Sequence, residues 1–107
     1  MFSVKTIVIT SFGLLVAFSA LAREVVIDVR TTQEFQAGHI DGALNIPHGD
    51  IAQDIFKAKV NKDDHVVLYC RSGNRSGIAL KTLQGIGFTN AENYGSLEDA
   101  KKRLQKP

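Results

Sequence analysis

The stretch that most constrains the fold is a short apolar run that ends in a cysteine and is followed by a glycine-containing loop. Residues 66–69 (Val-Val-Leu-Tyr) are β-branched, aliphatic or aromatic, and they predict a buried strand. Cys70, the only cysteine in the chain, occupies the last position of that strand. After the polar loop residues come apolar side chains among good helix formers, at Ile78, Leu80, Leu83 and Ile86. The pattern predicts a strand, a loop and a helix in succession.

A thiol at this position faces the N-terminus of the following helix and the backbone N–H groups of the loop. Both are places that favour an anion, and therefore thiolate over thiol. The helix dipole alone contributes about 0.3–1 kcal/mol, which is less than the roughly 1.4 kcal/mol that one pKa unit requires. Hydrogen bonds to a charged sulfur, at about 1.5–3 kcal/mol each, or nearby cations must supply the rest.

The loop after Cys70 offers both hydrogen bonds and cations. Gly73 can adopt the positive φ of a tight cradle, and Arg71 and Arg75 flank it. We expect the Arg71 side chain to point outward at the mouth of a pocket, and Arg75 to order the loop through hydrogen bonds to loop carbonyls. The alternative is an inert buried cysteine beside two solvated arginines. The strand-end position, the glycine and the two cations together favour a reactive cysteine.

The rest of the chain alternates strands with helices. The segment 24–29 is apolar on both faces and predicts a central strand of a parallel sheet. Residues 31–34 have capping-box spacing and predict a short helix to about residue 36. A turn is expected over 38–42, and further strands are expected over 43–46 and 91–94. Helices are expected over 49–57, from the loop after Cys70 to Gly85 or Gly87, and from 96 to about 105. In the helix over 49–57, the side chains of Ile51, Ile55 and Phe56 are expected to face inward. The alternation predicts an α/β domain, with a parallel β-sheet flanked by helices and right-handed crossovers.

Polar residues are expected at one edge of this sheet, because ligands of such sheets bind beyond the carboxyl ends of the strands. Asp28 and Arg30 end one predicted strand and Cys70 ends another, so all three could reach the same rim. Asp28 is expected to be structural, holding loops or Arg30. His39 is expected to be a hydrogen-bonding loop residue, and the three histidines are scattered without ligand spacing, so no metal site is expected.

The first 22 residues differ from the rest of the chain. Lys5 precedes an uncharged apolar stretch over 7–20 that runs into Ala20-Leu21-Ala22, a pattern typical of a secretory signal peptide and its cleavage site. We therefore expect a signal peptide over 1–22, one domain over 23–107 and a periplasmic protein without membrane contact. A retained membrane anchor is the alternative, although the stretch is near the lower limit of about 17 residues for a span.

Composition after this cleavage narrows the function further. Removing 22 of the 107 residues leaves 85 and lowers the formal net charge from +2 to +1, because Lys5 is the only charged side chain lost. So small a charge, without a basic stripe, argues against nucleic acid as a partner. An unpaired cysteine in an exported chain indicates a reactive thiol or an intermolecular bond.

Several separated stretches resemble one known family. Residues 70–76 (Cys-Arg-Ser-Gly-Asn-Arg-Ser), after an apolar strand, resemble the active-site loop of single-domain rhodaneses, which are thiosulfate sulfurtransferases. Residues 26–30, 34–35 and 38–47 resemble the first signature of the family. Residues 87–88 and 93–95 resemble its closing segment. The resemblance covers nearly everything after residue 24, and it is closest to the small exported rhodaneses of the phage shock type.

This resemblance implies a small rhodanese-like domain that moves a sulfane sulfur from thiosulfate to cyanide or a thiol acceptor in a ping-pong cycle. It implies that Cys70 is the nucleophile and carries the persulfide. Arg71 and Arg75 would attract the dianionic donor, while backbone N–H groups of the loop hold the persulfide sulfur. The implied substrate-binding residues are Arg71, Ser72, Gly73, Asn74, Arg75 and Ser76, with Asp28 and Arg30 in support. No cofactor is implied, and a monomer is expected.

Two other functions stay open at the level of sequence. Cysteine-dependent phosphatases and arsenate reductases also place a cysteine and an arginine in an anion-binding loop, but with five residues between them. Here four residues separate Cys70 from Arg75, and the smaller cradle suits a single sulfur atom better. Asp28 stays open as the general acid that phosphate-ester cleavage would want. A non-catalytic binding or persulfide-carrier module is the third reading, and the presence of Cys70 counts against it.

The chain also departs from the family pattern. Rhodaneses usually have a second glycine and then a tryptophan after the last strand, whereas here Gly95 is followed by Ser96 and Leu97 and the chain has no Trp. The loop also lacks the Cys-Gly-Ser/Thr-Gly pattern of mercaptopyruvate-using relatives, and its two arginines suit a dianion, so thiosulfate is the expected donor. The missing glycine and tryptophan, and an N-terminus shorter than that of a full rhodanese domain, concern the pocket rim more than the loop, so they leave the acceptor open.

Overall fold

A computed structural model describes residues 23–105 of the chain. The elements in chain order are β1 (Glu24–Asp28), α2 (Thr32–Ala37), β2 (Leu44–Asn45), η1 (His48–Asp50), α3 (Ile51–Lys57), β3 (His65–Cys70), α4 (Asn74–Gly85), β4 (Ala91–Ser96) and α5 (Leu97–Gln105). Each predicted strand and helix is present, with bounds within two residues of those expected. The predicted signal peptide lies outside the described residues. Among residues 23–105, no helix is both long and apolar enough to cross a membrane.

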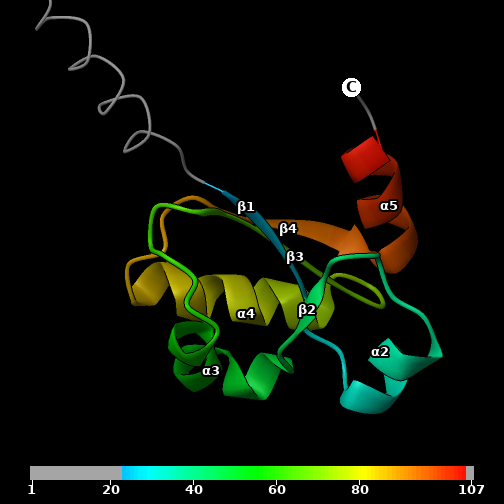
Figure 1. Ribbon diagram of the computed structural model, residues 1–107, viewed down its shortest axis with the longest axis horizontal. Coiled ribbons are helices and arrows are strands. Elements are labelled where there is room, and N and C mark those ends of the chain that lie inside the picture. Colours follow the sequence, from blue (N-terminus) through cyan, green and yellow to red (C-terminus); the bar gives the residue numbers. More distant parts are fainter. Residues whose placement is uncertain (1–22, 106–107) are drawn as a thin grey trace, which may run out of the picture.

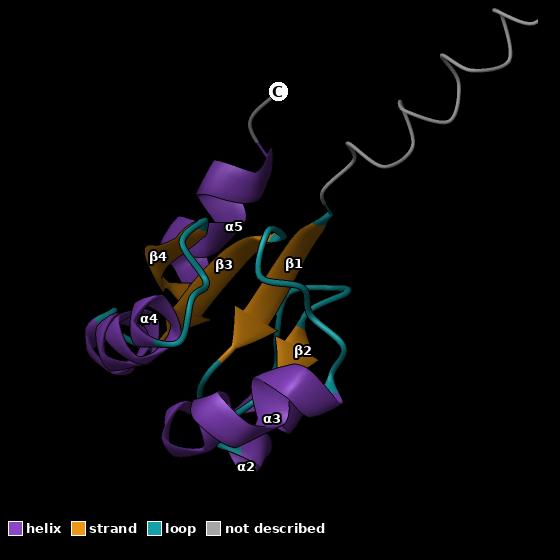
Figure 2. Cartoon of the chain, turned by 90° about the vertical axis from the view of Figure 1, so that its left-hand side faces the viewer, coloured by secondary structure: helices purple, strands orange, loops and turns teal. Residues whose placement is uncertain are grey.

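The strands form one parallel sheet in the order β2-β1-β3-β4. Figure 2 shows the strands side by side, with their arrows pointing the same way. β1 lies between β2 and β3, as its apolar character on both faces predicts. β3 is the other interior strand, and all of its residues after His65 are buried. The predicted α/β architecture is confirmed.

Helices cover both faces of the sheet. Figure 1 shows α3 and α4 on one side of the strands and α5 on the other. Because side chains alternate along a strand, Val66, Leu68 and Cys70 of β3 join the core cluster. The helix residues of that cluster are Ile51, Ile55, Ala79 and Leu83. The Cys70 side chain therefore lies on the α4 face of the sheet, beside the helix that follows it in the chain.

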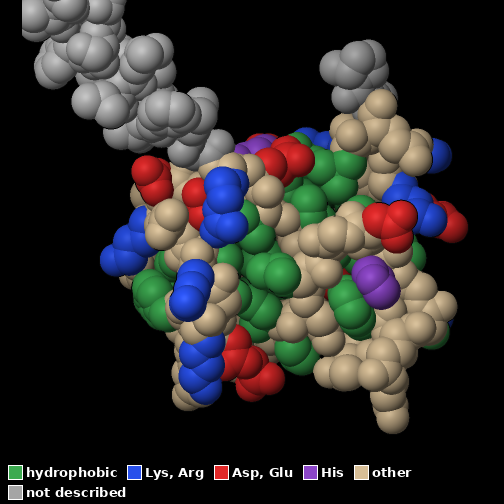
Figure 3. All heavy atoms as spheres, in the orientation of Figure 1, with side chains coloured by type: hydrophobic (Ala, Val, Ile, Leu, Met, Phe, Trp, Pro, Cys, Tyr) green, Lys and Arg blue, Asp and Glu red, His purple; other side chains and the backbone are tan. Residues whose placement is uncertain are grey.

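One predicted core residue is wrong. Phe56 was expected to face inward, but it is 52% exposed, and its ring meets the Phe88 ring at 5.7 Å between centroids. The reason is that α3 makes fewer than two full turns, so only Ile51 and Ile55, one turn apart, face the sheet. The space-filling view of this face shows apolar side chains at the surface between charged ones that gather mainly at its edges (Figure 3).

The sheet is irregular next to the end of β3. Leu68 pairs with Asn93 and Cys70 with Ser96, so β4 has one more residue than β3 between these two pairings. Such a bulge bends the strand and redirects a side chain. Gly95 within the bulge has φ 89°, in the left-handed region that favours glycine. The bulge extends β4 to Ser96, two residues beyond the predicted end, and places Asn93 beside the loop that follows Cys70.

Candidate active site

The thiol of Cys70 lies in a cradle formed by the loop after β3 and the first turn of α4. Its Sγ atom accepts a hydrogen bond from the Gly73 backbone N–H at 2.9 Å, and the Ser76 hydroxyl lies 3.3 Å away. Gly73 has φ 95°, and a Cβ there would lie 3.3 Å from the Gly95 backbone. The loop can therefore close this tightly only with glycine at position 73. Both Cys70 and Ser76 are fully buried.

Hydrogen bonds in the cradle favour the thiolate. Burial raises the pKa of the Cys70 thiol, but the Ser76 hydroxyl and the backbone N–H groups of Ser76, Ser72 and Gly73 outweigh it and hold that pKa below its ordinary value. The sequence left open whether hydrogen bonds or cations would do this. In the structure, the donors that meet Sγ belong to Gly73 and Ser76 of the loop, whereas both arginine side chains meet Glu34.

Arg75 is held by a carboxylate from a distant helix and does not bond to the loop carbonyls as expected. Its Nη1 and Nη2 atoms donate to the two oxygens of Glu34 at 2.8 and 3.1 Å. Glu34 belongs to α2, where its carboxylate also accepts from the N–H of Thr31 in the predicted capping box. The Arg75 guanidinium, and then the Thr31 N–H, lower the pKa of Glu34 to about 2. The pair therefore stays charged at neutral pH and ties the start of α4 to α2.

Glu34 had not been singled out as a site residue. The capping box was the only signal that the sequence gave for it, and that signal concerns the helix rather than the loop. The Glu34–Arg75 pair spans 41 residues of sequence, so no local pattern could reveal it. Two planar groups joined by two hydrogen bonds fix each other's orientation, and this makes Glu34 part of the support of the loop.

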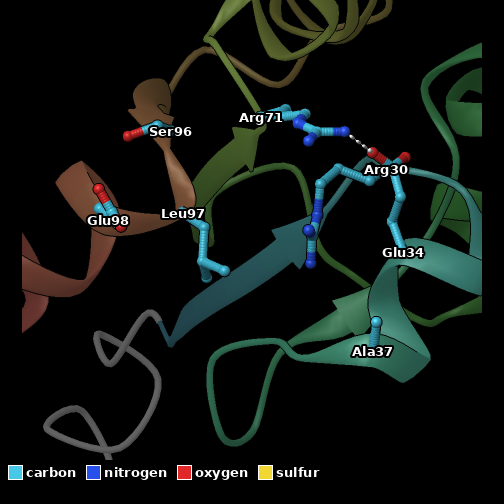
Figure 4. Close-up of a pocket in the computed structure, with 7 residues that line it drawn as sticks. All are labelled: Arg30, Glu34, Ala37, Arg71, Ser96, Leu97 and Glu98. Carbon is cyan, nitrogen blue, oxygen red and sulfur yellow. Dashed lines mark ion pairs between the residues drawn. The ribbon is translucent and has the colours of Figure 1, made fainter.

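Arg71 lies at the mouth of the site, as expected. Its side chain is 80% exposed, and Nη1 lies 3.8 Å from a Glu34 oxygen. A cavity of about 460 Å³ opens here, lined by Arg30, Glu34, Ala37, Arg71, Ser96, Leu97 and Glu98. Figure 4 shows Arg71 reaching toward Glu34 from one side, with Leu97 and Glu98 across the cavity. The Cys70 thiol is fully buried and does not line this cavity, although the neighbouring Arg71 does.

Asp28 and Arg30 form a buried pair at the end of β1. The Asp28 carboxylate accepts from the Arg30 backbone N–H at 2.9 Å, from Nε at 2.9 and 3.1 Å, and from Nη2 at 2.7 Å. Arg30 Nη2 also donates to the Gly38 carbonyl at 2.6 Å. Asp28 is fully buried, as its predicted structural role requires, and Arg30 is brought to the same rim as Arg71. Of the three residues expected at this rim, only Arg30 lines the cavity, whereas Asp28 and Cys70 are fully buried.

Asn93 of β4 clamps the loop and was not singled out from the sequence. Its Nδ2 donates to the Gly73 carbonyl at 2.9 Å, and its Oδ1 accepts from the Gly95 N–H at 2.9 Å and lies 2.7 Å from the Ser76 hydroxyl. One carboxamide thus contacts both groups that hold the Cys70 sulfur. The residue stands in the closing stretch of the resemblance, but its contacts depend on the bulge in β4, which the sequence does not show.

The remaining loop residues lie away from the sulfur. Ser72 and Asn74 are exposed, and the Ser72 hydroxyl accepts from the Asn74 N–H at 3.4 Å. The backbone N–H of Ser72, and not its side chain, helps to lower the pKa of the Cys70 thiol. Among the predicted substrate-binding residues, Gly73 and Ser76 therefore contact the sulfur, Arg71 lines the cavity and Arg75 supports the loop.

His39 makes the loop contact expected of it, with Nδ1 at 2.7 Å from the Phe35 carbonyl. Its ring stacks on the Phe35 ring, with 3.6 Å between the ring centroids. Within residues 23–105, no three side chains of His, Cys, Asp or Glu gather in a way that could hold a metal ion. The chemistry offered by the described residues is that of one activated thiol beside cations.

Comparison with known proteins shows the family of the chain. The family model of the rhodanese-like domain matches residues 16–102. The chain is 37% identical over 89 residues to the thiosulfate sulfurtransferase PspE of Escherichia coli, which covers 83% of this chain and 86% of that protein. It is 34% identical over 87 residues to the human thiosulfate:glutathione sulfurtransferase, covering 70% of this chain and 76% of that protein.

Solved structures show the same fold. A rhodanese with anions from E. coli superposes with a TM-score of 0.68 at 41% identity, covering 71% of this chain and 89% of the other. The human single domain sulfurtransferase TSTD1 superposes with a TM-score of 0.66 at 28% identity, covering 92% of this chain and 95% of the other. With the matched model spanning most of the sequence and the predicted fold and loop in place, this chain belongs to the rhodanese-like domain family.

Proposed function

We propose that this protein is a thiosulfate sulfurtransferase that works through a persulfide on Cys70. The Cys70 thiolate attacks the outer sulfur of thiosulfate, the bond between the two sulfur atoms of the donor breaks, and sulfite leaves with the electron pair. In the second half of the cycle, cyanide or the thiolate of an acceptor attacks the outer sulfur of the persulfide. The Cys70 thiolate then leaves, and no cofactor takes part.

The observation that carries this proposal is the sulfur-sized cradle around Cys70. An anionic sulfur at the end of β3 meets the Gly73 N–H at 2.9 Å and the Ser76 hydroxyl at 3.3 Å. Donors fixed in this way stabilise a charge on sulfur without having to reorganise during the reaction. The relatives named as sulfurtransferases support the same reading. The test is whether the purified protein makes thiocyanate from thiosulfate and cyanide.

The donor fits the charges at the mouth. Thiosulfate is a dianion, and Arg71 is the exposed cation at the mouth of a cavity that Arg30, Glu34 and Glu98 also line. The Arg75 guanidinium is held by Glu34, so its charge is partly neutralised and its proposed role is to hold the loop. Ser96 and Leu97, which depart from the family pattern, line the same cavity opposite Arg71, and we propose that they contribute to the choice of acceptor.

Phosphate-ester cleavage is disfavoured by the state of Asp28. A general acid must reach the leaving group, but Asp28 is fully buried and both of its oxygens accept from Arg30. A non-catalytic binding module would have no need for hydrogen-bond donors that hold the pKa of a buried thiol below its ordinary value. Neither alternative is favoured by a contact in the site.

The two arginines are expected to differ in their kinetic effects. Arg71→Ala should raise the KM for thiosulfate about two- to fivefold at low salt, because an exposed charge contributes modestly to binding and steering. Arg75→Ala should also lower kcat, by about tenfold or more, because it frees the loop and leaves Glu34 without its partner. Steady-state kinetics at low and high salt measures both effects, and the Arg71 effect should shrink as salt screens it.

Lys62→Ala is the matched control, since this exposed lysine precedes β3 at the end of the strand opposite Cys70. It should leave both constants unchanged. The assignment of roles would be reversed if Arg71→Ala changed kcat alone while Arg75→Ala changed only KM.

We further propose that the chain is exported and that the mature protein begins at Arg23. The Ala20-Leu21-Ala22 site supports this, and so does the surrounding of Arg23. Its backbone nitrogen lies 3.3 Å from Asp64 Oδ1 and its Nη2 lies 3.0 Å from Asp64 Oδ2. Cleavage after Ala22 would therefore place a new α-ammonium group against a buried carboxylate. The intact mass of protein recovered from the periplasm should match a chain starting at Arg23. A full-length chain found in the membrane fraction would favour the anchor instead.

A further inference from the structure

The contacts of Asn93 determine which way its carboxamide points. The Gly73 carbonyl can only accept a hydrogen bond, so the atom 2.9 Å from it must be the amide nitrogen. The Gly95 N–H can only donate, so the atom 2.9 Å from it must be the amide oxygen. Two backbone groups with fixed roles therefore leave no freedom for an amide flip. The oxygen of Asn93 faces Ser76.

This orientation decides the role of the Ser76 hydroxyl. Because Asn93 Oδ1 can only accept, the 2.7 Å contact requires Ser76 to donate its proton to Asn93. A serine hydroxyl has one proton, so Ser76 cannot at the same time donate fully to the Cys70 sulfur at 3.3 Å. It presents a lone pair to that sulfur instead, and a neutral thiol can donate its S–H into this lone pair.

Loss of the thiol proton reverses the requirement. A thiolate has no proton to donate and needs donors, and the Ser76 hydroxyl lies 3.3 Å from the sulfur. When the Cys70 proton passes to solvent, the Ser76 O–H gains most by rotating from Asn93 to the sulfur. Asn93 Oδ1 is not left unsatisfied by this rotation, because it keeps the hydrogen bond from the Gly95 N–H.

We propose that Asn93 is a positioning residue that sets the donor direction of the Ser76 hydroxyl, which donates to Asn93 while Cys70 is a thiol and to the sulfur once Cys70 is a thiolate or persulfide. The amide oxygen of Asn93 thus competes with the sulfur for one proton. The amide nitrogen holds the Gly73 carbonyl, and with it the N–H that stays on the sulfur in both states. The inference deepens the proposed function and rests on it, since it takes the thiolate and persulfide as the working states.

The charged groups around the sulfur lie outside this competition. Arg75 on α4 is paired with Glu34 on α2, Arg71 is exposed at the loop, and Arg30 is paired with Asp28 at the end of β1. None of them contacts Asn93 or the Ser76 hydroxyl in the described part of the chain. The competition is therefore confined to one hydroxyl and its two neighbours, and substitutions at 76 and 93 can isolate it.

A double-mutant cycle on the acid dissociation constant of the thiol tests the proposal. Thiolate formation is followed by absorbance at 240 nm in wild type, Ser76→Ala, Asn93→Leu and the double variant, with Cys70→Ser in each background as the baseline. Because Cys70 is the only cysteine, the signal belongs to this thiol. Ser76→Ala should lower the acid dissociation constant in both backgrounds. The factor by which Ser76→Ala lowers this constant should be about fivefold larger in the Asn93→Leu background than in the wild-type background. In Asn93→Leu the hydroxyl no longer loses a hydrogen bond worth about 0.5–1.5 kcal/mol when it turns to the sulfur.

An equal or smaller factor in the Asn93→Leu background would overturn the proposal, because a residue that only anchors the loop has no such coupling to Ser76. Asn90→Leu, the same change at an exposed residue before β4, is the matched control and should leave the factor as in wild type. Gly73 O keeps its bond from the Gly77 N–H without Asn93, which favours a folded variant. If circular dichroism shows Asn93→Leu unfolded, Asn93→Ala makes the same prediction.

The titration needs neither thiosulfate nor a sulfur acceptor, so its outcome does not depend on the proposed function. Coupling between Ser76 and Asn93 without thiocyanate formation would overturn the sulfurtransferase reading and leave the proton competition in place. Thiocyanate formation without coupling would do the reverse.

Discussion

Cys70→Ser is expected to abolish thiocyanate formation, with a loss of about 10³-fold or more in kcat/KM. A serine oxygen can occupy the cradle and accept from the Gly73 N–H, but its proton is far harder to remove and it forms no persulfide. Arg71 at the mouth and the Arg75–Glu34 pair that supports the loop stay in place, so the loss would belong to the nucleophile. The measurement is the rate of thiocyanate production from thiosulfate and cyanide.

Two controls sharpen this result. Cys70→Ala should be as inactive as Cys70→Ser, because both lack the thiol, and urea unfolding should show both variants folded. Thiocyanate production at the wild-type rate by either variant would contradict the account. So would a phosphate-ester cleavage activity of the wild type that the same substitutions remove, since that would support the phosphatase reading.

The second large effect is expected on stability, from Asp28→Asn. The change keeps the shape of the side chain but removes the charge opposite buried Arg30 and turns an amide donor toward a guanidinium that has only donors. Breaking a buried ion pair by removing one partner costs about 3–5 kcal/mol. A small domain has about 5–15 kcal/mol of unfolding free energy in total, so the variant should be marginally folded at room temperature.

Urea denaturation measures this loss against a matched control. Asp54→Asn removes a carboxylate whose side chain is 38% exposed and meets Lys57 at 3.6 Å, and an exposed pair of this kind contributes less than about 1 kcal/mol. Equal destabilisation by the two substitutions would mean that the Asp28–Arg30 pair is not the support of the β1 end. An Arg30→Met Asp28→Leu double variant that recovers stability would locate the loss in the unpaired charge.

The fold could be predicted because its signals are local. The apolar run before Cys70, the capping box at Thr31 and Glu34, and the glycine at position 73 each act within a few residues, and each is found where expected. The central place of β1 followed from its apolar character on both faces. The prediction for Phe56 was wrong for a related reason. Helix periodicity indicates which residues share a face, but in the short helix α3 only Ile51 and Ile55 are buried.

The sequence predicted the loop around Cys70 and missed the residues that support it. Cys70 and its loop are contiguous in sequence, and so their geometry could be anticipated. The partner of Arg75 is 41 residues away and Asn93 is 20 residues from the Gly73 carbonyl. Such pairs depend on how α2 and β4 pack around the loop, and the bulge that aims Asn93 has no sequence signal apart from Gly95. The expectation that Arg75 bonds to its own loop was the best that local reasoning could offer.

The most direct test of the central claim is the intact mass of the purified protein after incubation with thiosulfate and removal of small molecules. The account predicts a gain of one sulfur atom, absent in Cys70→Ser and lost again on addition of cyanide as thiocyanate appears. Since Cys70 is the only cysteine, the added sulfur can be assigned to it. Thiocyanate formation at full rate with no sulfur ever found on the protein would contradict the persulfide mechanism.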